Sequence, residues 1–325
     1  KKKKRNRKLQ RSQNTFAHRL LRMSMSFMRD QKAVNISDLS IFEGFLAPVF
    51  TCFENNEEKT LNVQHIDAYA EHLKFHGAKG VLVNSITGEG PILGKLERKL
   101  NAEAWSKACK KYKLTMLLQI GGAPLPDVLD LARHANKLNI QGVVCIPELF
   151  YKPRDVEHLV GYCKIVAKHC GQLPFLYYHL PRYTNLYFDM ADFCRRAEHR
   201  IPNFLGLEYS HSDLAMAAQC MAPKRVIILS DSRLLSSGLL LGLKTFCMVV
   251  FNMAPELMKA IYESMKCDDL DKAKAEQKQL NELIRERVTK QLRGRWVKYM
   301  KNWFNEEMKS PGGADFSAGH ARRLH

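Results

Sequence analysis

Three segments of this chain carry side chains that could do chemistry. The stretch Asn84–Gly90 contains glycine and hydroxyl residues, which let backbone amides approach a carboxylate or a phosphate. The stretch Leu176–Pro181 contains two tyrosines and a histidine, and Leu205–Ser210 contains Glu208. A buried carboxyl group without a charged partner has a raised pKa and can act as a general acid or base. Each motif is weak alone, because glycine-rich loops and Tyr-Tyr-His runs are common.

The elements that must position these segments alternate along the chain. From about residue 42, short apolar runs alternate with helical patterns at intervals of roughly 20–35 residues. Several runs are apolar throughout, as expected for parallel strands covered on both faces. The predicted strands are Gly44–Thr51, Gly80–Asn84, Thr115–Gly121, Gly142–Ile146, Pro174–His179, Phe204–Tyr209, Arg225–Ser230 and Thr245–Phe251. The predicted helices between them are Val63–Phe75, Leu96–Lys111, Asp127–Leu138, Val156–His169, Met190–His199 and Asp213–Met221.

Eight strand–helix units in 325 residues predict an α/β fold, a closed (β/α)₈ or TIM barrel with additional C-terminal helices. An open doubly wound sheet is the alternative, and the lack of a G-x-G-x-x-G motif after any strand weakens it. In such a barrel, chemistry collects at the C-terminal ends of the strands. All three chemical segments end predicted strands, so we expect their side chains to converge there.

The region after the last strand is predicted to be helical over Glu256–Lys309, with an apolar stripe that continues through Trp296 and Phe304. A basic aromatic helix could touch a membrane or RNA. We expect instead that the stripe packs on its own domain while the interleaved cations face water. The predicted organisation is a basic, disordered extension over 1–40, the barrel over 41–253, packed helices over 254–310 and a loosely ordered tail over 311–325.

Charge is concentrated at the start of the chain. Ten of the 51 Lys and Arg residues lie within residues 1–22, which hold no acid, so much of the net charge of +18 belongs to this segment. We interpret it as a solvated arm, although nucleic-acid binding or a nuclear address is an alternative. Residues 16–29 have the composition of a mitochondrial presequence. We expect a cytoplasmic protein, with a mitochondrial location as the alternative, and no nucleic-acid partner.

The nine cysteines are scattered, without a Cys-x-x-Cys pair, and most lie in apolar stretches. This predicts reduced, buried thiols rather than disulfides or a zinc site. No apolar run reaches the roughly 18–20 residues that a membrane-spanning helix requires. We therefore expect no membrane span, no bound metal and no cofactor.

Taken together, the motifs are specific. The chain resembles the N-acetylneuraminate lyase and dihydrodipicolinate synthase superfamily of pyruvate-dependent class I aldolases, and most closely the animal sialic acid lyases. The resemblance spans about Phe42 to Asn252. It is carried by the segments Gly44–Thr51, Val83–Gly90, Gln119–Gly122, Tyr177–Pro181 and Leu239–Gly242.

The resemblance implies a defined chemistry. In the family, a lysine at the end of strand six forms an imine with the ketone, and this imine is the electron sink for carbon–carbon cleavage. A tyrosine at the end of strand five shuttles the proton, and two hydroxyl residues after strand two hold the pyruvate carboxylate. Tyr178 keeps the tyrosine position and Thr87 keeps the second hydroxyl. The first hydroxyl falls on Ile86 and the lysine falls on Glu208, and neither residue can do the family's task.

The sugar-binding positions that the resemblance implies are also altered. The segment after strand seven falls on Ser230–Arg233, which places Ser232 and Arg233 at the site, and the serine after strand eight falls on Val249. Lys244 precedes strand eight and Lys152 follows strand four, so we expect neither to replace the missing nucleophile. The carboxyl group of Glu208 could be neutralised by Arg182 or Arg233.

These changes predict that the protein is a non-catalytic lyase homologue that acts as a scaffold, a binding protein or a regulatory subunit. The resemblance implies a small-molecule oxo acid or sugar acid as the ligand of any retained pocket, and a homotetramer. One alternative is an active pyruvate-dependent lyase with an unconventional site, which would cleave N-acetylneuraminate to N-acetylmannosamine and pyruvate. Another is an enzyme of a different class, such as a hydratase or hydrolase, that uses Glu208 as an acid or base.

Overall fold

The computed structural model describes residues 38–288, 296–310 and 316–322. The predicted basic extension over 1–40, with its possible presequence, therefore lies almost wholly outside the described residues. Eight parallel strands close into a barrel in chain order, and β8 pairs with β1. The strands are β1 (Gly44–Pro48), β2 (Gly80–Val83), β3 (Thr115–Gln119), β4 (Gly142–Cys145), β5 (Phe175–His179), β6 (Phe204–Tyr209), β7 (Val226–Leu229) and β8 (Thr245–Cys247).

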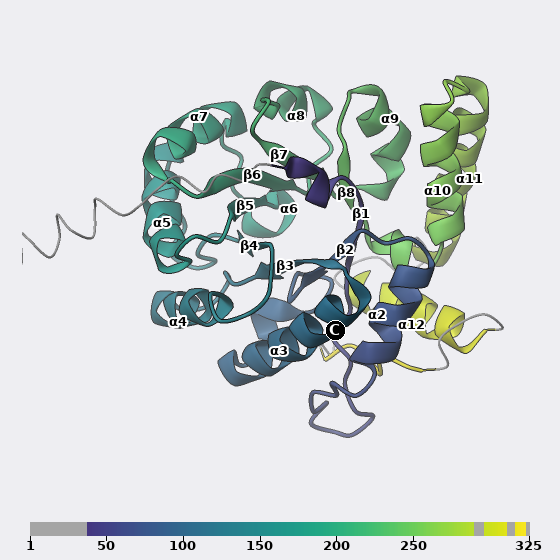
Figure 1. Ribbon diagram of the computed structural model, residues 1–325, viewed down its shortest axis with the longest axis horizontal. Coiled ribbons are helices and arrows are strands. Elements are labelled where there is room, and N and C mark those ends of the chain that lie inside the picture. Colours follow the sequence, from purple (N-terminus) through teal and green to yellow (C-terminus); the bar gives the residue numbers. More distant parts are fainter. Residues whose placement is uncertain (1–37, 289–295, 311–315, 323–325) are drawn as a thin grey trace, which may run out of the picture. The chain divides into compact units, whose positions relative to one another are not determined.

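Helices lie outside the strands and surround them, as Figure 1 shows for α3, α4, α5, α7, α8 and α9. The predicted (β/α)₈ barrel with additional C-terminal helices is confirmed. The helices are α2 (Ile66–Phe75), α3 (Lys95–Tyr112), α4 (Leu125–Ala135), α5 (Val156–His169), α6 (Pro181–Thr184), α7 (Met190–Arg200), α8 (Leu214–Cys220), α9 (Leu235–Leu240), α10 (Pro255–Lys266), α11 (Leu270–Val288) and α12 (Trp296–Lys309). Four 3₁₀ turns complete the described elements, namely η1 (Leu39–Phe42), η2 (Gly90–Ile92), η3 (Ser232–Leu234) and η4 (Val249–Asn252).

The sequence accounts for where the outer helices begin. Three of them start after an aspartate whose carboxylate accepts a hydrogen bond from a backbone amide of the first turn, which satisfies a group that the helix itself cannot pair. Asp155 does this for α5, Asp189 for α7 and Asp213 for α8, at 2.8, 2.9 and 3.0 Å. Six of the strands are buried along their whole length, and β1 and β6 are partly buried only at their first residue. The barrel is therefore a filled core on both faces of its sheet.

The predicted eighth strand was too long. It was expected to run to Phe251, but β8 ends at Cys247 and the chain turns into η4. Asn252 stabilises this turn, because its side-chain amide donates to the carbonyl oxygens of Pro48 and Val249 at 3.2 and 2.9 Å. Apolar content alone could not distinguish this buried turn from a strand.

The C-terminal helices pack against the domain, as predicted. Leu280, Val288, Met300, Trp303 and Phe304 are buried, while Leu292 of the same predicted stripe lies outside the described residues. The expectation that the cations of this stripe all face water was wrong, since Lys301 is fully buried.

The prediction of a loosely ordered tail was also wrong for residues 316–322. Phe316, Ala318 and Ala321 are buried there, and the amide of Phe53 donates to the carbonyl oxygen of Ala318 at 3.0 Å. Apolar contacts and backbone hydrogen bonds thus hold this segment, although its composition is typical of a loose tail.

The thiols agree with the prediction except at one position. All nine cysteines are free and eight are buried, whereas Cys267 is exposed. In the parts of the chain that the structure describes, no helix is long and apolar enough to cross a membrane.

Candidate functional site

The C-terminal ends of the strands surround a cavity of about 620 Å³, called here the mouth cavity. All eight residues predicted to form the site line it, so the expected convergence is confirmed. They are Ile86 and Thr87 after β2, Tyr178 on β5, Glu208 on β6, Ser230, Ser232 and Arg233 after β7, and Val249 after β8. Tyr178 and Glu208 are register partners on neighbouring strands.

Glu208 is the most unusual group of this cavity. Its side chain is 1% exposed, and Ser230 donates a hydrogen bond to Oε1. The second oxygen, Oε2, is buried and has no hydrogen-bond partner among the described residues. Burial raises the pKa of this carboxyl well above its usual value of 4.5, and the bond from Ser230 offsets this only in part. Burial therefore favours the protonated, neutral form of Glu208 over the carboxylate.

The expectation that an arginine neutralises Glu208 was wrong. Arg233 forms an ion pair with Asp231 instead, with 2.6 Å between a guanidinium nitrogen and Oδ2, and its side chain is 60% exposed. Arg182 is exposed and makes no ion pair with a described residue. Protonation rather than a counter-ion compensates for the burial of Glu208, because ionisation without a partner would cost far more.

Tyr178 stays in its neutral phenol form. Burial raises the pKa of Tyr178 well above 10, and the neighbouring carboxyl of Glu208 raises it further. Cys247 on β8 shows the same pattern, because burial and then Glu208 raise the pKa of its thiol. The base of the mouth cavity is thus made of uncharged groups that can donate protons or hydrogen bonds.

The loop after β2, which carries Ile86 and Thr87, has a fixed backbone shape with two residues of positive φ. Asn84 and Glu89 both have positive φ, at 57° and 56°, and Gly90 follows them. A Cβ atom on Gly90 would lie 1.8 Å from the carbonyl oxygen of Asn84, so only glycine fits. The hydroxyl of Thr51 donates to the carbonyl oxygen of Gly88 at 2.5 Å.

Lys301 is a residue that the sequence analysis missed. Its ammonium group donates to the carbonyl oxygen of Thr51 at 2.6 Å and to Oε1 of Glu89 at 3.2 Å. Oε2 of Glu89 accepts from the backbone amide of Arg322 at 2.8 Å, and the Arg322 guanidinium pairs with Glu97 at 2.6 Å. This network joins α12 and the C-terminal segment to the loop after β2.

A signal for Lys301 was present in the sequence. Val297, Lys301, Phe304 and Met308 follow each other at steps of four, three and four residues, which places them on one face of a helix. Phe304 and Met308 are buried, so Lys301 is the cation that shares their face.

The other lysines discussed above lie away from the site. Lys244 forms an ion pair with Glu43 at 3.2 Å and its carbonyl oxygen accepts from Gly44, at the start of β1 and β8. Lys152 is exposed in the loop after β4. Among the described residues, no lysine lines the mouth cavity. Lys290 lies outside the described residues.

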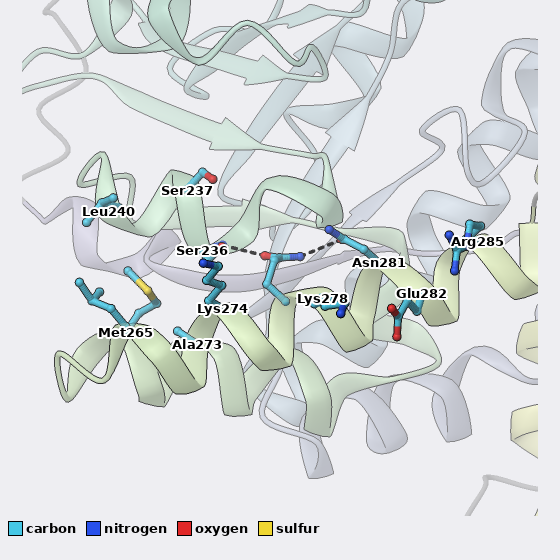
Figure 2. A pocket seen from close by; sticks show the side chains of 12 residues that line it. Ser236, Ser237, Leu240, Met265, Ala273, Lys274, Lys278, Asn281, Glu282 and Arg285 are labelled. Carbon is cyan, nitrogen blue, oxygen red and sulfur yellow. Dashed lines mark hydrogen bonds between the residues drawn. The ribbon is translucent and has the colours of Figure 1, made fainter.

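A second cavity of about 670 Å³ lies between α9 and α11. Figure 2 shows that it follows α11 from Lys274 to Arg285, with Leu240 and Met265 beyond Lys274, at the end away from Arg285. Gln277 also lines it, and its side-chain oxygen accepts from the amide of Ser236 at 2.9 Å. It lies on the outer helices rather than at the strand ends, and it shares Asn281 and Arg285 with the mouth cavity.

Within the described ranges, no group of three or more His, Cys, Asp or Glu side chains could hold a metal ion. The groups that line the mouth cavity include the carboxyl groups of Glu208 and Asp231, the phenol of Tyr178, His211, several hydroxyl groups and three arginines.

Comparison with known proteins gives the family. The model of the dihydrodipicolinate synthetase family matches residues 41–303. The chain belongs to this family. The chain is also similar to the N-acetylneuraminate lyase of Rattus norvegicus, with 28% identity over 247 residues, covering 74% of this chain and 77% of the relative. The enzyme of Xenopus tropicalis is 32% identical over 182 residues, and the match spans 55% of this chain but only 59% of that relative.

Solved structures of such proteins share the architecture. The N-acetylneuraminate lyase of Aliivibrio salmonicida superimposes with a TM-score of 0.78 at 30% identity, covering 87% of this chain and 90% of that one. The lyase of Proteus mirabilis gives the same TM-score at 26% identity, with 87% and 92% covered. The chain is thus an N-acetylneuraminate lyase-like member of the dihydrodipicolinate synthetase family, in agreement with the resemblance found in its sequence.

Proposed function

We propose that this family member does not cleave carbon–carbon bonds through an imine, and that its mouth cavity binds a small oxo acid or sugar acid. The observation that carries the proposal is Glu208, a buried carboxyl group at the position where the resemblance places the imine-forming lysine. An imine requires an amine nucleophile. A carboxylic acid cannot supply one, and no described lysine lines the cavity.

The surrounding changes support the same proposal. Ile86 has no hydroxyl to relay a proton or to hold a carboxylate, and Val249 stands where the resemblance implies a serine. Residues that act as one catalytic unit are strongly non-additive. Restoring one of these residues would therefore not restore lyase activity. We expect the Glu208→Lys variant to remain far below family-level activity.

Reductive trapping tests the proposal. The full chain is incubated with pyruvate and sodium borohydride, and its intact mass is measured alongside turnover of N-acetylneuraminate. We expect neither an adduct nor cleavage above buffer. An adduct on the wild-type chain, mapped by peptide mass spectrometry and abolished by Lys290→Arg or another lysine substitution, would establish an active lyase with an unconventional site. An animal sialic acid lyase is the positive control.

A second function is favoured by one observation, the unpartnered Oε2 of Glu208. A protonated carboxyl that faces a cavity can act as a general acid, as a hydratase or hydrolase requires. Turnover of hydroxy and oxo acids that is present in the wild type and lost in Glu208→Gln would support this function. The absence of such turnover supports binding alone.

Two properties of the whole protein complete the proposal. We propose a homotetramer, as the resemblance implies, and light scattering would then give a mass near four times the 37.4 kDa of one chain. We also propose a reducing compartment, the cytoplasm, which the eight buried free thiols support. Imaging of a reporter fused to residues 1–29 tests the mitochondrial alternative.

A further inference from the structure

Among the polar groups of the mouth cavity that lack partners within the described parts of the chain, three could bind a carboxylic acid. At the base is Oε2 of Glu208, which is buried. The guanidinium groups of Arg182, on α6, and Arg285, on α11, also line the cavity, and both side chains are exposed. Neither arginine forms an ion pair with a described residue, whereas Arg233 is already paired with Asp231.

Burial favours the protonated form of Glu208, and the bond from Ser230 decides which oxygen carries the proton. Ser230 donates its hydroxyl hydrogen to Oε1, so Oε1 is the accepting oxygen of this carboxyl. The proton of the neutral acid then sits on Oε2, which becomes a hydrogen-bond donor without an acceptor. Leaving a buried donor unsatisfied is costly, and a ligand oxygen that accepts from it would remove that cost.

The charged groups of the cavity indicate which end of such a ligand lies at the base and which end lies at the rim, the exposed edge of the cavity. A carboxylate at the base would have no cation to compensate its charge, because no Lys or Arg is hydrogen-bonded to Glu208. At the rim, Arg182 and Arg285 are the two described arginines of the lining that form no ion pair, and guanidinium groups bind carboxylates in a fork-like geometry. The walls between base and rim include Val249, Ile284 and Trp296, which suit an uncharged ligand body.

We propose that the mouth cavity binds a small carboxylic acid of sugar size in reversed orientation, with its carboxylate at the rim against Arg182 and Arg285. A carbonyl or hydroxyl oxygen of the ligand accepts a hydrogen bond from Glu208 at the base. This deepens the proposed function and rests on it only in taking the cavity as a binding site. The family chemistry described above requires the opposite direction, with the carboxylate at the loop after β2.

Calorimetry with a matched ligand pair tests the orientation. The probes are N-acetylneuraminate and its methyl ester, which has the same size but no charge. We expect the acid to bind at least tenfold more tightly than the ester, and its affinity to fall with added salt. The double variant Arg182→Gln/Arg285→Gln should lose about tenfold in affinity for the acid and little for the ester. Arg154→Gln, an exposed arginine that lines neither cavity, is the matched control.

Variants of Glu208 test the base of the cavity. Glu208→Gln keeps a donor of the same size, so we expect affinity within about threefold of the wild type, whereas Glu208→Met removes the donor and should lose about tenfold. Tighter binding by Glu208→Lys together with unchanged binding by the arginine variants would overturn the reversed orientation. Failure of the acid to bind at millimolar concentration would also overturn it. Neither result depends on reductive trapping, which decides the proposed function separately.

Discussion

Glu208 couples the charge state of one residue to the stability of the whole fold. Its folded-state pKa is raised by burial, whereas the unfolded chain releases the proton near the ordinary value of 4.5. Between these two points the unfolded chain holds fewer protons than the folded one. The contribution of Glu208 to the free energy of unfolding is therefore fully present at low pH. This contribution falls as the pH rises above about 4.5.

Replacing Glu208 with glutamine should remove this pH dependence. Relative to the wild type, Glu208→Gln should gain stability by about 1.4 kcal/mol for each pH unit above 4.5, up to the folded-state pKa. Urea unfolding at pH 5, 6, 7 and 8, followed by circular dichroism, measures the difference. Equal slopes for both proteins would mean that Glu208 ionises freely in the folded state.

A second prediction concerns the buried pair of Lys301 and Glu89. Burial lowers the pKa of Lys301, and the attraction of Glu89 opposes this, so removal of either partner leaves an uncompensated group. Lys301→Met should lose about 3–5 kcal/mol of unfolding free energy. Lys298→Met, an exposed lysine on the same helix, should change it by less than about 0.5 kcal/mol. In a double-mutant cycle, adding Glu89→Gln to Lys301→Met should cost less than Glu89→Gln alone, and additive losses would argue against the pairing.

At the residue scale, the sequence predicted which side chains meet and missed how they are charged. The spacing of the strand ends was enough to bring Tyr178, Glu208 and Thr87 to one cavity. The state of Glu208 depends on the absence of a nearby cation, and Arg233 pairs with its own neighbour Asp231 instead. Such a choice depends on side-chain geometry, which a sequence pattern does not contain.

At the scale of elements, β6 is distinguished by a bulge. Its register against β5 shifts between Phe175 and Leu176, which pair with Phe204 and Gly206. Gly206 has a φ of 154°, and a Cβ atom there would lie 1.9 Å from the carbonyl oxygen of Val226 on β7. Close approach of β6 and β7 therefore requires glycine two residues before Glu208.

A pair of glycine substitutions separates this constraint from general helix and strand preferences. Gly206→Ala should lose about 3 kcal/mol, because the backbones of β6 and β7 must move apart. Gly161→Ala lies in α5, where an added Cβ would meet no atom within 4 Å. It should gain about 0.5–1 kcal/mol from the better helix propensity of alanine. Thermal or urea unfolding gives both values, and a neutral Gly206→Ala would show that the barrel relaxes there.

The elements themselves were largely predictable, because parallel strands and amphipathic helices have distinct apolar periods. The prediction of Val156–His169 as a helix matched α5 at both ends, where Asp155 caps the first turn. The prediction for Thr245–Phe251 failed because a buried 3₁₀ turn is as apolar as a buried strand. The difference lies in Asn252, whose side chain binds backbone groups that are distant in sequence.

At the scale of the whole molecule, the C-terminal segment completes the loop after β2. Removal of residues 314–325 deletes the contacts of Phe316, Ala318 and Arg322 with the rest of the domain. We expect faster hydrogen exchange at the amides of Glu89 and Gly90, which bond to Ile86 and Ser85, with little change in the strands. Unchanged protection of these two amides would mean that the loop holds its shape without the segment.

The contacts of Glu89 with Lys301 and Arg322 can form only late in the synthesis of the chain. A ribosome makes Glu89 212 residues before Lys301 and 233 residues before Arg322. At about 5–20 residues per second, this loop would wait roughly 10–50 seconds for its partners. Until β8 is complete at Cys247, the nascent barrel also lacks its last strand, so β1 presents an unpaired edge that invites association with other chains. Cells that make this protein would therefore need to shield the half-made barrel, and a premature stop shortly before Arg322 would release a closed barrel with an unfinished mouth.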